Sequence, residues 1–352
     1  MSDAETYQSL TADFTAACRV EDLARAAAPG DELAQGEFLA RVLADPRAGL
    51  HLCHAMLRPL ATAEQIEGFR RSGSADLGNA RVERIGNAGH VILHNPRYLN
   101  AEDEPTTRAL EIGVDLVLSD PGCQVGVLRG DVVEHPKYAG RHIFNAGLNL
   151  THLYEGKIPF AGFMMSRELG LVSKIYRGLW LADDWESGLE DFVEKPWIAA
   201  VEAFAIGGGC QLLLVHDRVI AEGGAFLTLP ARKEGIVPGA SNARLWRFVG
   251  DRAARQAITF ERGFSVDEPD GCLIVDRVVE RDGMDAALAE DAERIVGSGL
   301  QAAVSNRRMI RVGQEPMELF RRYMANYARE QSRCLHDPAV KRNLETNWLK
   351  RG

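Results

Sequence analysis

Residues 204–217 have the sequence FAIGGGCQLLLVHD. Its three consecutive glycines separate an apolar run from a second apolar run with helical spacing, which predicts a strand, a tight turn and a helix. A helix that begins within the triplet leaves its first N–H groups unpaired, and glycines let a ligand oxygen approach them closely. The triplet therefore favours a site that stabilises negative charge on an oxygen, although glycines that only allow close packing would give the same pattern.

The segments around the triplet alternate between strand-like and helix-like patterns. Helical spacing predicts helices at 106–120 and 187–195. Short runs rich in β-branched or aromatic residues predict strands at 89–95, 123–130, 141–147, 197–203, 217–223 and 225–230. This alternation predicts an α/β fold.

Helical patterns dominate both ends of the chain. We expect an N-terminal helical extension at 1–80 with a turn-rich boundary at 71–80, a core at 81–284 and a C-terminal helical region at 285–352. The C-terminal stretch ELFRRYMANYAREQSRCL carries more apolar and aromatic residues than a free tail exposes. We therefore expect the C-terminal region to mediate assembly into a homo-oligomer.

Composition narrows the classes of function. The net charge of −9, with Lys and Arg dispersed, argues against nucleic acid as a partner. No apolar run approaches the roughly 18 residues of a membrane span and no signal peptide opens the chain, so we expect a cytoplasmic protein without a membrane partner. The six cysteines do not pair, the nine histidines lack metal-ligand spacing and GxGxxG is absent. These patterns predict no metal and no flavin.

Four segments, in the same order along the chain, resemble segments of the crotonase (enoyl-CoA hydratase/isomerase) superfamily. They are HNPRYLNAEDEPT at 94–106, HIFNAGLNLTHL at 142–153, KPWIAAVEAFAIGGGCQLLLVHDRVIAEGGAFLTLPARKEGIVPG at 195–239 and RQAITFERGFSVDEPDGCLIVDRVVE at 255–280. The resemblance implies a ββα spiral core and a homotrimer or homohexamer. It also implies that the N–H groups of Leu148 and Gly208 hold the thioester oxygen of an acyl-CoA as an enolate, with Gly147 and Gly207 as neighbouring substrate-binding residues.

The positions that activate water in hydratases of this family differ here. The resemblance puts the two hydratase glutamates at Gln211 and Ala231, and neither residue exchanges a proton near neutral pH. Glu234 lies three positions after Ala231, and we interpret it as a surface or loop charge. Hydration of a double bond is therefore not expected.

A narrower resemblance concerns YEGKIPFAGFMMSRELGLVSKIYRGLW at 154–180, Gln211 and the helical N-terminal extension. These features are similar to those of the cofactor-independent dioxygenases of the superfamily. Such enzymes act in the biosynthesis of dihydroxyphenylglycine, a building block of glycopeptide antibiotics. The implied reaction converts 3,5-dihydroxyphenylacetyl-CoA and O2 to the arylglyoxylate and CoA without metal or flavin. Such a site must be dry and apolar. Candidate wall residues are Phe163, Phe204, Ile206 and Leu227, although the same apolar side chains also fit plain core packing.

The same resemblance assigns three polar residues. Arg167 would orient the substrate or stabilise a peroxide-level anion, unless it forms only a surface ion pair with Glu168 or Asp183. Glu102 would meet the aryl hydroxyl end, unless it only supplies negative charge at a helix N-terminus. Gln211 would form a hydrogen bond with a phenol without ionising. The base for the α-proton stays open between Glu102 and a relay through the phenol.

Two other classes of function fit the same residues. One is another crotonase-type reaction on an aryl- or acyl-CoA without O2, such as thioester hydrolysis, decarboxylation or isomerisation. The other is a non-catalytic acyl-CoA-binding protein. Consumption of O2 separates the first class from the dioxygenase reaction, and turnover of any kind separates the second.

Overall fold

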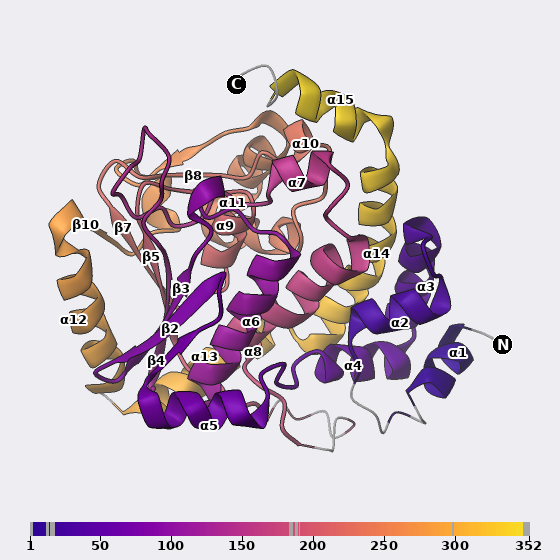
Figure 1. Ribbon diagram of the computed structural model, residues 1–352, viewed down its shortest axis with the longest axis horizontal. Helices are drawn as coiled ribbons and strands as arrows, with labels where there is room; N and C mark the ends of the chain where they lie inside the picture. The colour runs from indigo at the N-terminus through magenta and orange to yellow at the C-terminus, as the bar shows by residue number, and fades with distance from the viewer. Residues whose placement is uncertain are drawn as a thin grey trace.

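The computed structural model describes residues 3–11, 14, 18–182, 186, 189, 191–297 and 299–347, which form the expected α/β fold (Figure 1). Within this part of the chain, the main sheet has seven strands in the order β1-β2-β3-β4-β5-β7-β10, and a smaller sheet has the order β6-β8-β9. The strands of the main sheet are β1 (Ser74–Asp76), β2 (Ala80–Ile85), β3 (Ala88–Leu93), β4 (Val125–Gly130), β5 (Trp197–Val201), β7 (Arg218–Glu222) and β10 (Arg277–Val279). Those of the smaller sheet are β6 (Phe204–Ile206), β8 (Phe226–Thr228) and β9 (Phe264–Ser265).

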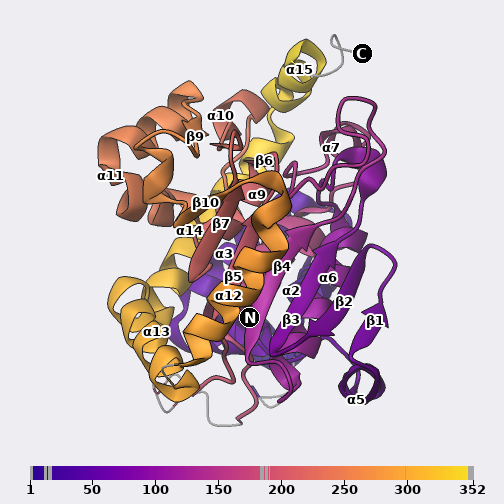
Figure 2. The same ribbon diagram turned by 90° about the vertical axis from the view of Figure 1, so that its left-hand side faces the viewer.

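The main sheet is parallel from β3 through β4, β5 and β7 to β10, while β1 and β2 extend it in antiparallel register. Every residue of β5 is buried, as expected for a parallel strand that is covered on both faces. Helix α6 (Glu104–Ser119) packs on one face and α12 (Met284–Gly297) on the other, as Figure 2 shows. The chain leaves the carboxyl end of β5 directly into β6 and the glycine triplet.

Helices cover the rest of the core. Those before the sheet are α1 (Asp3–Leu10), α2 (Val20–Ala27), α3 (Glu32–Ala44), α4 (Pro46–Ala55) and α5 (Ala63–Ser72). Those between strands are α7 (Leu150–Tyr154), the π-helices η2 (Phe160–Met165) and η3 (Arg167–Val172), α8 (Ser173–Arg177), α9 (Gly208–Leu213), α10 (Ala231–Glu234) and α11 (Ser241–Phe260). The last are α13 (Leu300–Gln314), α14 (Met317–His336) and α15 (Pro338–Asn347). Short 3-10 turns occur at Pro96–Tyr98, Gly271–Leu273 and Arg281–Gly283.

Helix α14, in the C-terminal region, packs along α3 of the N-terminal extension, at the right of Figure 1. Its apolar side chains Phe320, Met324 and Tyr327 are buried in a second core, which also contains residues of α2, α3, α4 and η2. The reason given above for an oligomer is therefore wrong, because the apolar face of this tail is covered by its own chain. Large exposed apolar side chains lie elsewhere, at Trp246 and Phe260 on α11 and at Met309 and Ile310 on α13.

Three local predictions differ from the structure. The expected boundary at 71–80 contains β1, which pairs with β2. Residues 141–147 form single bridges to Val132 and Ala205 in place of a continuous strand. The predicted helix at 187–195 lies partly outside the described residues, and its described part is extended, with Val193 bridged to Leu179.

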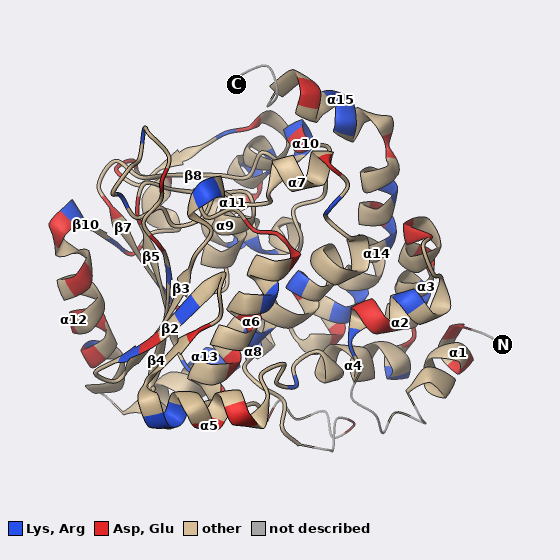
Figure 3. Ribbon diagram, in the orientation of Figure 1, with Lys and Arg blue, Asp and Glu red and all other residues tan. Residues whose placement is uncertain are grey.

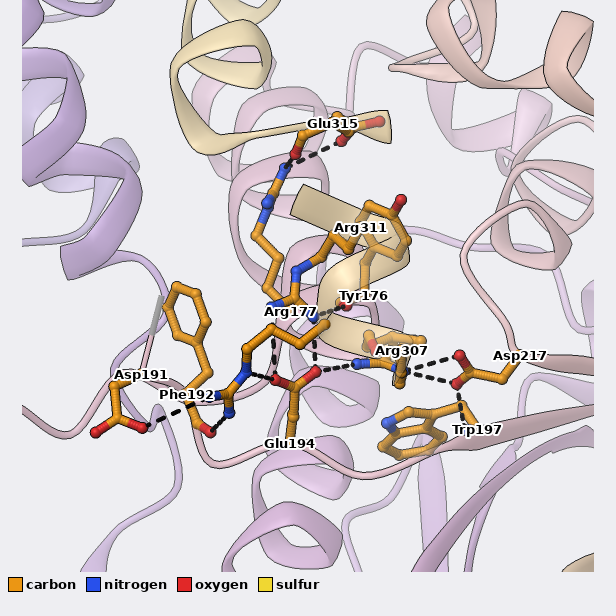
Figure 4. A network of polar contacts seen from close by, with 12 residues as sticks. Tyr176, Arg177, Asp191, Phe192, Glu194, Trp197, Asp217, Arg307, Arg311 and Glu315 are labelled. Carbon is orange, nitrogen blue, oxygen red and sulfur yellow. Dashed lines mark hydrogen bonds and ion pairs between the residues drawn. The ribbon is translucent and has the colours of Figure 1, made fainter. Parts of the chain in front are cut away.

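A buried ion-pair network explains the extended course before β5 (Figure 4). Glu194 accepts hydrogen bonds from Arg307 (2.8 Å), Arg308 (2.6 Å) and Arg311 (2.6 Å) of α13, and Arg307 also pairs with Asp217 at 2.7 Å. Burial alone would raise the pKa of Glu194, but these three guanidinium groups hold it below its usual value. The network ties α13 to the segment that leads into β5 and the glycine triplet.

The charges of the molecule are mixed along its outer helices. Figure 3 shows acidic and basic residues together on α5 and on α15. Among the helices that the structure describes, none is both long enough and apolar enough to cross a lipid bilayer.

Candidate active site

A cavity opens where β6 ends and α9 begins. Its lining includes Gly207, Gly208 and Gln211 from the triplet and α9, Leu148 from the turn before α7, and Arg167 from η3. Five of the seven site residues predicted from the sequence therefore line one cavity. The other two, Gly147 and Glu102, lie directly behind it.

The turn that follows residues 141–145 lies against the glycine triplet. Asn145 bridges to Ala205 of β6, and the Ile206 N–H donates to the Asn145 carbonyl at 3.0 Å. Gly147 has φ of +81°, and a Cβ there would lie 2.5 Å from the carbonyl oxygen of Ile206 and 3.1 Å from the nitrogen of Gly208. Only glycine fits at this position, because any side chain would push the two turns apart.

Both candidate oxyanion donors are unpaired. Among the hydrogen bonds of the described residues, neither the Leu148 N–H nor the Gly208 N–H has an acceptor. Glu102 bridges to Leu148 through the Gly147 carbonyl and the Asn149 N–H, both at 2.7 Å, which leaves the Leu148 N–H free. Gly208 opens α9, so its N–H is one of the unpaired groups of a helix start. Two unpaired donors on one cavity can bind an oxygen that becomes negative.

Arg167 is buried, and its guanidinium is surrounded by acceptors. It donates to both carboxylate oxygens of Glu102 (2.5 and 3.0 Å), to Glu168 (2.8 Å), to Gln211 Oε1 (3.0 Å) and to the Gly208 carbonyl (2.8 Å). Burial alone would lower the pKa of Arg167, but the charge and hydrogen bonds of Glu102 raise it. The alternative of a surface ion pair is wrong, because the arginine and both of its carboxylate partners are buried. Asp183 lies outside the described residues.

Glu102 connects Arg167 to the turn that carries Leu148. Its carboxylate accepts from Arg167 and, at 2.8 Å, from the Asn145 side-chain amide, whose oxygen accepts the Gly147 N–H at 2.6 Å. Glu102 is fully buried and does not line the cavity. Its described contacts therefore position other groups. Sequence reasoning did not single out Asn145, and its place in the FNAG segment was the available signal.

Glu234 lies on the wall of the cavity, so its interpretation as a surface or loop charge is wrong. Only 7% of the residue is exposed, and burial raises the pKa of its carboxyl group to about 7. Ala231 lies on the same wall, one helical turn earlier in α10. Because residues three apart share a helix face, α10 presents Glu234 beside the position at which a hydratase carries its second glutamate.

Apolar side chains close the cavity from several elements. Phe163 is the one of the four predicted wall residues that lines it, whereas Phe204, Ile206 and Leu227 do not. Phe204 and Leu227 are buried in the core, and Ile206 is half-buried and packs against the apolar cluster that contains Phe204. Tyr327 of α14 is a wall residue that the sequence did not reveal, because nothing local indicates that the tail folds back over the site.

The described residues offer no cluster of three or more His, Cys, Asp or Glu side chains that could hold a metal ion. The polar groups of the cavity are an arginine, two carboxylates, an amide, a phenol and backbone N–H groups. This set can bind a carbonyl oxygen, move a proton and orient a hydroxyl group.

Comparison with known proteins assigns the family. The sequence model of the enoyl-CoA hydratase/isomerase family matches residues 89–328. The chain belongs to this family. The assignment agrees with the crotonase-type core expected from the sequence.

Relatives and solved structures extend this assignment. The (3,5-dihydroxyphenyl)acetyl-CoA 1,2-dioxygenase of Amycolatopsis orientalis is 43% identical, over 93% of this chain and 80% of its own. The short-chain-enoyl-CoA hydratase of Clostridium acetobutylicum is 28% identical, over 68% of this chain and 84% of its own. The crystal structure of an enoyl-CoA hydratase from Bacillus halodurans shares the fold, with a TM-score of 0.62 and 18% identity over 76% of this chain and 100% of its own.

Proposed function

We propose that this protein is a cofactor-independent dioxygenase that converts 3,5-dihydroxyphenylacetyl-CoA and O2 to 3,5-dihydroxyphenylglyoxylate and CoA. The observation that carries the proposal is the 43% identity with a dioxygenase of that name over 93% of the chain. The family model matches residues 89–328 only. An alignment over 93% of the chain therefore extends beyond the part that all family members share. The cavity is compatible with this reaction, since Gln211 and Ala231 stand where hydratases activate water.

The reaction balances without an added reductant or oxidant. One oxygen atom of O2 becomes the ketone oxygen at the α-carbon, and the other enters the carboxylate as the C–S bond of the thioester breaks. The two α-hydrogens leave as protons, one of which CoA takes up as its thiol. A dihydroxyphenyl ring spreads the charge of the α-carbanion, so the substrate supplies the electrons that a cofactor supplies elsewhere.

The cavity offers a role for each predicted residue. The Leu148 and Gly208 N–H groups would hold the enolate oxygen, a contact worth about 3–4 kcal/mol per donor in comparable sites. The Gln211 side-chain nitrogen has no acceptor among the described residues and would donate to a ring hydroxyl. Apolar walls at Phe163 and Met164 would keep water from reprotonating the carbanion.

An oxygen electrode tests the proposal directly. Purified protein that has been treated with a chelator and shows no visible absorbance should consume one O2 for each thiol released from 3,5-dihydroxyphenylacetyl-CoA. With ¹⁸O2, mass spectrometry should find both labelled atoms in the arylglyoxylate. Thiol release without O2 uptake would instead establish a thioesterase, and activity that requires iron, copper or flavin would exclude the cofactor-independent reaction.

We also propose a homo-oligomer, a trimer or a hexamer. The support is the group of exposed apolar side chains on α11 and α13, which include Phe260 at 79% and Met309 at 68% exposure. Light scattering at micromolar protein should give three or six chain masses, and a monomeric mass would refute this assembly.

A further inference from the structure

The proposed reaction begins with loss of an α-proton, and a base must take that proton inside the cavity. Two carboxylates line the cavity, Glu168 and Glu234. Glu168 is occupied, because it accepts from Arg167 at 2.8 Å and from the Ala240 N–H at 3.1 Å. Glu102, considered earlier as the base, is held by Arg167 and Asn145 behind the wall. These contacts leave Glu234 as the carboxylate with free lone pairs on the cavity.

The carboxylate of Glu234 has no side-chain hydrogen bond or ion pair among the described residues. Lys233, the next residue, pairs with Glu261 at 3.2 Å. A buried acid without a partner is costly in a native structure and calls for an explanation. Free lone pairs and reduced hydration are the conditions under which a carboxylate acts as a base near neutral pH.

The position of Glu234 is fixed by the backbone around it. Helix α10 is a single turn that ends at Gly235 with φ of +85°, a left-handed cap favourable for glycine. The N–H groups of Gly235 and Ile236 both donate to the Ala231 carbonyl, at 2.9 and 3.1 Å. The chain then continues as cavity wall through Val237. Glu234 is thus held on the same cavity as the two unpaired N–H groups of Leu148 and Gly208.

We propose that Glu234 is the catalytic base that removes the α-proton of the arylacetyl thioester, an inference that rests on the proposed function. The α-carbon–hydrogen bond breaks, its electron pair forms the enolate, and the enolate oxygen is held by the Leu148 and Gly208 N–H groups. The proton passes to the carboxylate of Glu234. Glu234 returns this proton to the CoA thiolate when the C–S bond breaks, and the second α-proton leaves to solvent as the ketone forms, so the carboxylate is regenerated in each turnover.

The test compares Glu234→Gln with the matched control Glu261→Gln, which changes a carboxylate near the same helix but outside the cavity. Each protein is incubated with 3,5-dihydroxyphenylacetyl-CoA in D2O without oxygen, and mass spectrometry follows deuterium at the α-carbon. O2 uptake is then measured in air. Glu234→Gln should lower both rates about 100-fold or more, the usual contribution of a general base, and Glu261→Gln should change them less than threefold. Substrate affinity in the absence of O2 should be the same for both variants within threefold.

The outcomes separate this proposal from the proposed function. If Glu234→Gln exchanges or consumes O2 within threefold of the wild type, Glu234 is not the base, whereas the dioxygenase reaction stands. If the wild type exchanges deuterium but consumes no O2, the dioxygenase reaction fails, and loss of exchange in Glu234→Gln still assigns the base. If the abstracted proton returns to the α-carbon before it exchanges with D2O, deuterium uptake does not report the step. The rates of O2 uptake by the two variants then show whether Glu234 is the base. Glu234→Asp, which keeps a carboxylate, should recover part of the lost rate.

Discussion

The guanidinium of Arg167 has no N–H left for a substrate. Its five donors meet Glu102 twice, Glu168, Gln211 and the Gly208 carbonyl. Arg167 therefore acts in this state through its charge and through the groups it orients. A direct contact with a peroxide-level anion would require it to give up one of these partners, and the bonds to the two neutral acceptors, Gln211 and the Gly208 carbonyl, are less costly to lose than those to the carboxylates.

Replacing Arg167 by lysine should leave a charge but break the fork of hydrogen bonds to Glu102. A lysine offers three donors on a compact ammonium and cannot bind a carboxylate in a bidentate way. Because a buried carboxylate that loses its partner costs about 3–5 kcal/mol, we expect Arg167→Lys to lose a part of that amount in the free energy of unfolding. Urea titration measures this loss, and unchanged stability would show that the pair with Glu102 is not needed for the fold.

Anaerobic deuterium exchange then shows which step Arg167 serves. If the arginine acts only after O2 has added, Arg167→Lys should lose most O2 uptake and keep α-hydrogen exchange. Loss of both would mean that the chain from Arg167 through Glu102 and Asn145 to Gly147 is needed to hold the Leu148 N–H in place.

The carboxyl group of Glu234, which has no partner among the described residues, should make the stability of the protein depend on pH. Burial holds its pKa at about 7 in the folded protein, above the ordinary value of 4.5. At pH 4 the carboxyl is mostly protonated in both the folded and the unfolded protein. As the pH rises, it ionises first in the unfolded chain, which lowers the free energy of unfolding. This loss is complete above pH 7, where the folded protein also ionises. We therefore compare the free energy of unfolding of Glu234→Gln with that of the wild type at each pH. The difference between the two proteins should shift in favour of the variant by on the order of 3 kcal/mol from pH 4 to pH 8. Urea unfolding of both proteins at these two pH values measures the effect, and a difference that does not grow with pH would contradict it.

Other charged or polar side chains lie on the elements packed around this carboxyl. They are Lys233 on α10, Glu261 after α11, Arg167 and Glu168 on η3, Tyr327 on α14 and Lys341 on α15. Comparison with Glu234→Gln cancels their shared contribution, because they are present in both proteins.

The N-terminus of α9 presents an N–H group, that of Gly208, with no acceptor among the described residues, as the glycine triplet predicted. Gly208→Pro removes the candidate N–H donor, and proline is tolerated at the first position of a helix. We expect this variant to lose both anaerobic α-hydrogen exchange and O2 uptake about 100-fold or more, as for other oxyanion donors. Circular dichroism must first show that it folds, and exchange at the wild-type rate would remove Gly208 from the oxyanion hole.

The sequence predicted local elements well where the signal was local. The strands β3, β4, β5, β7 and β8 and the turn–helix of the triplet follow from runs of β-branched residues and from glycine. The extended course of 191–195 did not follow, because Glu194 is fixed by arginines more than a hundred residues away. Glu234 was misinterpreted because position 231 was considered alone, without the single helical turn that puts both residues on one wall.

The N-terminal and C-terminal helices share one apolar core, and α14 also supplies part of the cavity wall. Gly36 of α3 makes the close approach of α14 possible, because a Cβ there would lie 2.1 Å from the Ser332 hydroxyl. We expect Gly36→Ala to destabilise the protein by about 1–3 kcal/mol through overpacking, and to lower activity because α14 carries the wall residue Tyr327.

Gly68 of α5 is the matched control, because a Cβ at that position meets nothing within 4 Å. Gly68→Ala should be neutral or stabilise the protein by up to about 1 kcal/mol, since alanine is the better helix former. Thermal unfolding of the two variants checks the pair. Equal stability of the two would show that α3 and α14 can separate at no cost.

The pairing of α3 with α14 also sets an order of events during synthesis. Helix α3 leaves the ribosome early, but its partner is among the last segments to emerge. At typical rates of translation, the apolar side of α3 waits roughly 15–60 s for α14. Over that interval the nascent chain carries uncovered Phe38, Leu39 and Leu43, side chains that the finished protein buries. The apolar face of α3 therefore stays without its partner through most of synthesis, until α14 has emerged.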